Sequence, residues 1–138
     1  MHPDQTPEIL DTPEEFSLVK RAKSFTHAGR GLFVFLKTTH NAWIHLVLAL
    51  VAVVLGVTFS ITTTEWLFVI LAAGLVLVTE AVNTAIEIDI DLTSPEYHPY
   101  ARDTKDVAAG AVLLAALTAL LIGLIIFVPH VVGVVGSW

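Results

Sequence analysis

Three long apolar runs constrain the fold of this sequence more than any other feature. They lie at about residues 42–61, 66–91 and 107–128, and the third contains no charged side chain. Because a helix rises about 1.5 Å per residue, roughly 20 apolar residues match the hydrocarbon core of a bilayer. The sequence therefore predicts an all-α integral membrane protein with three transmembrane helices. Its 55% hydrophobic content agrees with that prediction.

The segments between the runs predict how the spans connect. Residues 60–65 form a turn so short that the first two spans must be antiparallel, and a polar loop with two prolines, 92–100, ends the second span. Pro129 is expected to end the third span and leave residues 129–138 as a C-terminal tail. Small residues recur every four positions in the third span, which favours close helix packing in lipid; they are Ala111, Ala115, Ala119 and Gly123.

The N-terminal region predicts a helix that lies on the membrane surface. Residues 1–11 lack periodicity and are expected to form a disordered tail, whereas Thr12 and Pro13 followed by Glu15 are typical of a helix start. The predicted helix, 12–37, carries apolar and basic residues on opposite faces, which suits anionic headgroups. An amphipathic helix packed on other protein remains the alternative. Residues 12–128 then form one membrane domain.

The basic residues predict the orientation. Five of the seven Lys and Arg residues lie between Lys20 and Lys37, and the other two, Arg102 and Lys105, follow the second span. The positive-inside rule places these segments in the cytoplasm and the C-terminus outside. A multi-pass protein of the plasma (inner) membrane is expected, with no nucleic-acid partner.

A polar stripe interrupts the second span. At about 100° per residue its members share one helix face, while Asp89 points the other way; they are Glu80, Asn83, Thr84, Glu87 and Asp91. Carboxylates inside a span are expensive and usually mark a functional site. Helix-to-helix contacts or a place among the headgroups are the simpler explanations.

The stripe suggests chemistry that needs a cation and a base. Glu87 with Asp91 or a neighbouring acid suits a hard cation such as Mg²⁺, and Glu80, deeper in the span, suits a general base. Lys105 and the basic surface helix offer charge for phosphates. Neither a Walker loop nor a G-x-G-x-x-G motif is present. Three helices cannot enclose the stripe, so a homo-oligomer with sites between protomers is expected.

Several motifs together resemble the small prokaryotic diacylglycerol kinase and undecaprenol kinase family. They are Glu80-Ala-Val-Asn83-Thr-Ala-Ile-Glu87 followed by Asp91, then Ser94-Pro-Glu96-Tyr97-His98, then Lys105-Asp106-Val-Ala-Ala-Gly110-Ala. The resemblance covers about residues 25–127. The residues of the second and third motifs are more similar to the undecaprenol kinase branch than to the diacylglycerol kinase branch.

The resemblance implies a homotrimer that transfers the γ-phosphate of ATP, with Mg²⁺, to a membrane lipid alcohol. Glu80 matches the catalytic base, Asn83 supports it, and Glu87 matches a magnesium ligand that also contacts the nucleotide. The remaining matches are nucleotide contacts: Lys20, His27, Glu96, Tyr97, His98, Lys105 and Asp106.

Two positions depart from the family pattern. Thr39 stands where many members supply a second carboxylate to the metal, and Trp43 stands where a basic residue is common. The replacement at Thr39 leaves several alternatives. The protein could bind the metal more weakly, water or His40 could take the place of the missing carboxylate, or the enzyme could be impaired. Without the resemblance, a small channel or proton-coupled carrier and a non-catalytic membrane oligomer rank nearly level with a kinase, since both accommodate carboxylates in a span.

Overall fold

The protein is built from four helices, as a computed structural model that describes residues 18–136 shows. They are α1 (Leu18–Thr38), α2 (His40–Thr58), α3 (Thr63–Thr93) and α4 (Pro99–Val135). No strand occurs within the described range. Helices α2, α3 and α4 are each long and apolar enough to cross a membrane. The predicted all-helical fold with three membrane-spanning helices is therefore confirmed, while the expected helix start at Thr12 lies outside the described residues.

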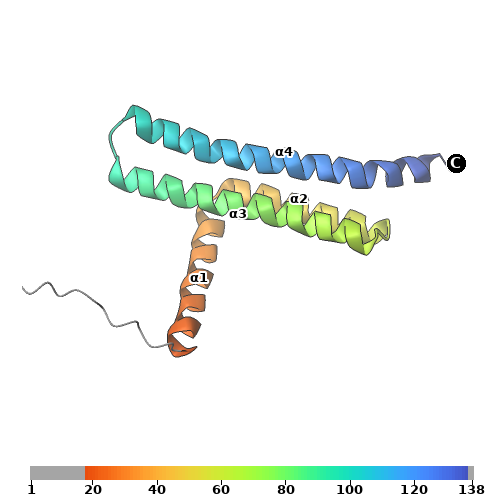
Figure 1. Cartoon of the computed structure of the whole chain (residues 1–138), viewed down its shortest axis with the longest axis horizontal. Coiled ribbons are helices and arrows are strands. Elements are labelled where there is room, and N and C mark those ends of the chain that lie inside the picture. The colour runs from red at the N-terminus through yellow and green to blue at the C-terminus, as the bar shows by residue number, and fades with distance from the viewer. Residues whose placement is uncertain (1–17, 137–138) are drawn as a thin grey trace, which may run out of the picture.

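Helices α2, α3 and α4 form an elongated bundle from which α1 projects at a steep angle (Figure 1). α3 and α4 run antiparallel along most of their length, and α2 packs mainly on α3. Thr39 alone separates α1 from α2, with an extended backbone. We call residues 38–41 the corner, because the chain turns there from α1 into the bundle.

Local capping interactions explain where α3 and α4 begin. The backbone N–H of Glu65 donates to Thr62 Oγ1 at 3.3 Å, and the backbone N–H of Thr62 donates to Glu65 Oε2 at 2.7 Å. This reciprocal capping box starts α3 at Thr63, before the predicted start near Trp66. At the start of α4, the backbone N–H of Tyr100 donates to His98 Nδ1, and Pro99 occupies the first turn.

Pro129 does not end α4, contrary to the expectation from sequence. The helix continues through it to Val135. A proline removes one helical N–H, and transmembrane helices tolerate this when other groups satisfy the backbone nearby. The carbonyl that Pro129 leaves without its helical partner is that of Ile125. One residue farther along, His130 Nδ1 lies 2.7 Å from the carbonyl oxygen of Ile126. Because a carbonyl can only accept, the imidazole is the donor in this contact.

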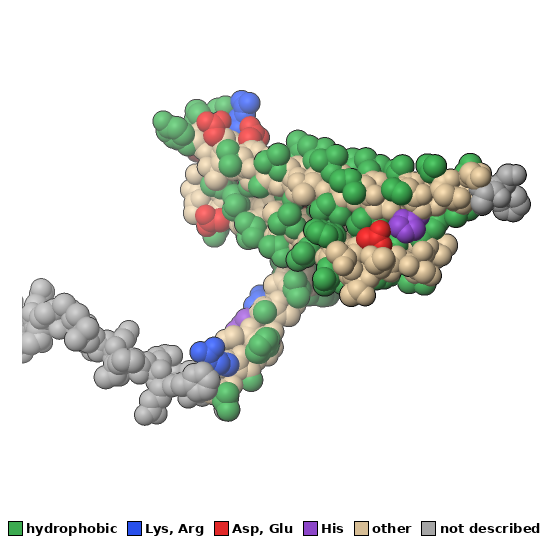
Figure 2. Space-filling model, turned by 45° about the vertical axis from the view of Figure 1, so that its right-hand side comes forward, with side chains coloured by type: hydrophobic (Ala, Val, Ile, Leu, Met, Phe, Trp, Pro, Cys, Tyr) green, Lys and Arg blue, Asp and Glu red, His purple; other side chains and the backbone are tan. Residues whose placement is uncertain are grey.

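A small hydrophobic core lies at the end of the bundle that carries the α2–α3 turn. Ile61, Val69 and Ile126 are buried together there, and Trp66 packs against them. Gly56 is buried beside Trp66, and an added Cβ would lie 2.8 Å from that indole. Elsewhere the bundle surface is mainly hydrophobic, with charged side chains near its ends and on α1 (Figure 2). That distribution suits a bilayer around the bundle.

Candidate functional site

The polar stripe of α3 runs from a buried end to an exposed end. Glu80 is 1% exposed, and Asn83 and Thr84 are also buried. Glu87 is half-buried and Asp91 is exposed. The predicted stripe therefore has a desolvated carboxylate at one end and a solvated one at the other, with Asp89 exposed.

Asn83 and Glu87 are joined by a hydrogen bond along the stripe. The Nδ2 group of Asn83 donates to Glu87 Oε1 at 3.1 Å. This bond fixes the amide orientation, because only the nitrogen end of the amide can donate to a carboxylate. Asn83 Oδ1 is buried and has no hydrogen-bond partner among the described residues. A buried acceptor without a partner destabilises the fold, so its presence needs an explanation, such as a ligand that it binds.

The corner contacts the stripe directly. Thr39 Oγ1 and Thr84 Oγ1 lie 2.8 Å apart, and Thr84 Oγ1 donates to the backbone carbonyl of Glu80 at 3.0 Å. On the other side of the corner, Trp43 Nε1 donates to the carbonyl of Leu36 at 2.9 Å. Helical periodicity placed Thr84 on the stripe but gave no sign of its contact with Thr39, which lies 45 positions away in the sequence.

A polar pocket of about 280 Å³ lies between the corner and the stripe. The predicted base, Glu80, and the predicted metal ligand, Glu87, both line it. The remaining lining residues come from the corner and from α3: Thr38, Thr39, His40, Asn41, Asn83, Thr84, Ile88 and Asp91. The pocket thus joins the predicted base, its supporting amide and the predicted metal ligand.

Lys105 reaches the exposed end of the stripe from α4. Its Nζ donates to Asp91 Oδ1 at 2.8 Å. Asp106 pairs instead with Arg102, at 3.5 Å, and both side chains are exposed. Of the two predicted nucleotide contacts on α4, only Lys105 therefore lies against the stripe, through a contact with Asp91 that was not predicted from the sequence.

The other predicted nucleotide contacts are not gathered around the pocket in one protomer. Glu96, Tyr97 and His98 are exposed in the α3–α4 connection, where His98 caps α4. His27 is exposed on α1, which makes no contact with α4 within the described residues. The side chain of Lys20 lies outside the described part of the chain.

The pocket offers few ligands for a metal ion. Within residues 18–136, no three His, Asp or Glu side chains gather closely enough to hold one. Glu87 and the unpaired Asn83 Oδ1 are oxygen ligands, which hard cations prefer. Mg²⁺ commonly takes one or two protein carboxylates and completes its shell with water and phosphate oxygens. The residues present fit Mg²⁺ delivered with a nucleotide better than a site formed by protein alone.

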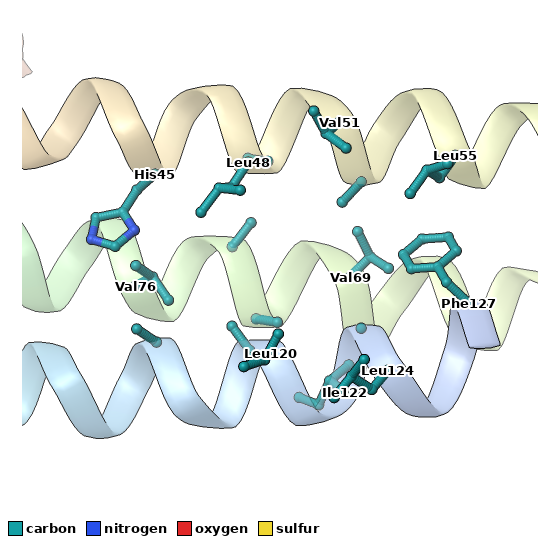
Figure 3. Close-up of a pocket in the computed structure, with 17 residues that line it drawn as sticks. His45, Leu48, Val51, Leu55, Val69, Val76, Leu120, Ile122, Leu124 and Phe127 are labelled. Carbon is teal, nitrogen blue, oxygen red and sulfur yellow. The ribbon is translucent and has the colours of Figure 1, made fainter.

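An apolar groove of about 390 Å³ lies farther along the bundle (Figure 3). Leu48 and Leu55 of α2, Val69 and Val76 of α3, and Phe127 of α4 line it, with His45 at one end. The groove is nearly free of polar groups, so it suits a hydrocarbon chain or an apolar helix face.

Comparison with known proteins identifies the family. Residues 26–127 match the family model of prokaryotic diacylglycerol kinase. The chain is 39% identical to the undecaprenol kinase of Bacillus subtilis over 107 residues, which cover 78% of this chain and 87% of that protein. It is 32% identical to a diacylglycerol kinase of Helicobacter pylori over 110 residues, covering 75% and 86%.

A diacylglycerol kinase of Escherichia coli is 31% identical over 84 residues, covering 61% of this chain and 69% of that protein. The matched region includes the corner, the whole polar stripe and Lys105. The chain therefore belongs to the prokaryotic diacylglycerol kinase family, and it is a membrane phosphotransferase that acts on a lipid alcohol.

Proposed function

We propose that this protein transfers the γ-phosphate of ATP to undecaprenol, with diacylglycerol as the alternative acceptor, in cell-envelope lipid metabolism. The observation that supports this most is the buried Glu80 in a pocket whose stripe ends beside Lys105. The preference for undecaprenol rests on the 39% identity to an undecaprenol kinase, against 31–32% for the diacylglycerol kinases compared above.

The base is Glu80 in this proposal. Its carboxylate accepts the proton of the lipid hydroxyl as the hydroxyl oxygen bonds to the γ-phosphorus of ATP, while the bond from that phosphorus to the β,γ-bridging oxygen breaks. The products are the lipid phosphate, ADP and a protonated Glu80, which returns its proton to water. Asn83 orients Glu87 through the hydrogen bond that joins them.

Charge neutralisation comes from the other end of the stripe. Lys105 exchanges its exposed partner Asp91 for phosphate oxygens, and Glu87 with Asn83 Oδ1 would hold Mg²⁺. Bound Mg²⁺ would supply charge to the phosphates during transfer. Glu96, Tyr97, His98 and Asp106 are assigned to nucleotide binding by the family resemblance, as are Lys20 and His27.

A homotrimer explains why the assigned residues lie apart in one protomer. Few residues of α2 or α4 are buried within a single chain, and α1 is exposed along most of its length. We assign the membrane domain to residues 12–128, with the N-terminus cytoplasmic and the C-terminus outside, because both basic segments lie on one side. The α3–α4 connection then meets cytoplasmic ATP.

The test is phosphorylation by the purified protein in mixed micelles. Undecaprenol and diacylglycerol are offered separately with γ-labelled ATP and titrated Mg²⁺. Label in undecaprenyl phosphate is the expected product. Label only in phosphatidic acid would reassign the acceptor, and label in neither lipid from a folded oligomer would overturn the proposal.

A further inference from the structure

The hydroxyl of Thr39 bonds to another helix and does not cap its own helix, α2. Thr39 is the N-cap residue of α2, where a threonine side chain normally accepts a hydrogen bond from a backbone N–H of the first turn. Among the described residues it makes no such capping bond. Its oxygen lies instead 2.8 Å from Thr84 Oγ1, on another helix and 45 positions away in sequence.

The direction of each hydrogen bond follows from the number of protons. A threonine hydroxyl carries one proton, and Thr84 gives its proton to the carbonyl of Glu80. Thr39 must therefore donate to Thr84. The resulting relay runs from the corner through Thr84 to the backbone of Glu80, and the pocket lies beside it.

The corner has little freedom to move without breaking this relay. Phe35 and Ala42 are buried on either side of it, and Ala42 is 0% exposed. Trp43 Nε1 also ties the start of α2 to the last turn of α1. Since the corner forms one wall of the pocket and α3 forms the other, the Thr39–Thr84 bond sets the distance between the two walls.

We propose that Thr39 and Thr84 are positioning residues for phosphoryl transfer, which hold the corner at a fixed distance from the turn of α3 that carries Glu80. This inference rests on the proposed function. Neither threonine takes part in the chemistry. Their bond keeps the pocket narrow enough to hold the phosphates of ATP beside the lipid hydroxyl, so its loss is expected to weaken the binding of ATP in the reactive position.

Kinetics of four single variants and one double variant test the role. Thr39→Val and Thr84→Val keep the side-chain shape but remove the hydroxyl, and each is expected to raise KM for ATP by about three- to tenfold. Thr39→Ser and Thr84→Ser keep the hydroxyl and should stay within about twofold of the wild type. The double Val variant should be no worse than the worse single variant, because either change removes the same bond.

Thr118→Val is the matched control. It removes a hydroxyl that bonds only within its own helix, to the carbonyl of Leu114, on an exposed part of α4. A merely structural loss would lower the amount of folded enzyme and so kcat, at an unchanged KM. Wild-type KM in both single Val variants, or independent effects that multiply in the double variant, would overturn the proposal.

A second measurement does not depend on activity. The sequence contains no cysteine, so spin labels can be attached to cysteines introduced at the exposed positions Leu32 of α1 and Val78 of α3. With labelled chains diluted among unlabelled ones, Thr39→Val should broaden the distance distribution between the labels, and Thr39→Ser should not. An unchanged distribution would contradict the proposal, whereas an inactive wild type with the expected broadening would overturn only the proposed function.

Discussion

Asn83 donates its amide Nδ2 to Glu87 Oε1 at 3.1 Å, and this bond leaves its own Oδ1 buried without a partner in the described part of the chain. The same residue therefore orients one predicted ligand and presents another to the pocket.

Replacing Asn83 by leucine should abolish activity without lowering stability. The change removes one hydrogen bond, worth about 1 kcal/mol, but also removes a buried unpaired acceptor, which costs about 1–3 kcal/mol. We expect turnover to fall by about a hundredfold or more, while the thermal unfolding midpoint in detergent stays level or rises. Marked destabilisation would show that Oδ1 already has a partner in the resting protein.

Glu87→Gln should raise the magnesium requirement. Glu87 is the half-buried carboxylate of the stripe, and loss of its charge removes the best hard ligand near Asn83. We expect the Mg²⁺ concentration for half-maximal rate to rise about tenfold, and direct binding of Mn²⁺ followed by electron paramagnetic resonance to weaken in parallel. Asp89→Asn, on the exposed opposite face of α3, is the control. An unchanged requirement in Glu87→Gln would remove Glu87 from the metal site.

Lys105→Gln should weaken ATP binding and leave stability almost unchanged. The ion pair with Asp91 is exposed, and pairs of that kind contribute little to stability because water screens the charges. The loss of a cation for the phosphates should raise KM for ATP about tenfold. Arg102→Gln removes an exposed cation from the same turn of α4 and serves as the control. If both substitutions raise KM for ATP equally, the effect comes from general surface charge and not from a specific contact of Lys105 with the phosphates.

Two glycine-to-alanine substitutions should shift stability in opposite directions. At Gly56 the new Cβ would lie 2.8 Å and 2.9 Å from two atoms of Trp66, so the packed end of the bundle must give way. We expect a loss of about 1–3 kcal/mol. At Gly74 nothing lies within 4 Å of the added Cβ, and the better helix propensity of alanine should stabilise α3 by up to about 1 kcal/mol. The thermal unfolding midpoints of the two variants test these changes in stability. A Gly56→Ala variant more stable than the wild type would contradict the described packing against Trp66.

Sequence alone predicted the helices well because membrane thickness leaves few options for long apolar runs. It was less accurate at their ends. The capping box of Thr62 and Glu65 was present in the sequence and placed the start of α3 earlier than hydropathy did. Pro129 was expected to terminate a helix, but α4 continues through it to Val135, as transmembrane helices can when polar groups nearby satisfy the backbone.

The candidate site was predictable only along one helix. Helical periodicity placed the stripe on one face, and the structure confirms the gradient of burial from Glu80 to Asp91. The Thr39–Thr84 bond joins residues far apart in the chain, and Lys105 meets Asp91 across two helices. Such contacts depend on how α2 and α4 pack on α3, which no local pattern specifies.

The most direct test of the proposed function is phosphoryl transfer to undecaprenol by the wild type and by Glu80→Gln, assayed side by side as folded oligomers of equal size. The glutamine keeps the shape of Glu80 but cannot accept the proton of the alcohol. We expect the wild type to form undecaprenyl phosphate, and the variant to be slower by about 10²–10⁴-fold, with Asp89→Asn as active as the wild type. A Glu80→Gln variant that turns over at the wild-type rate would show that Glu80 is not the base.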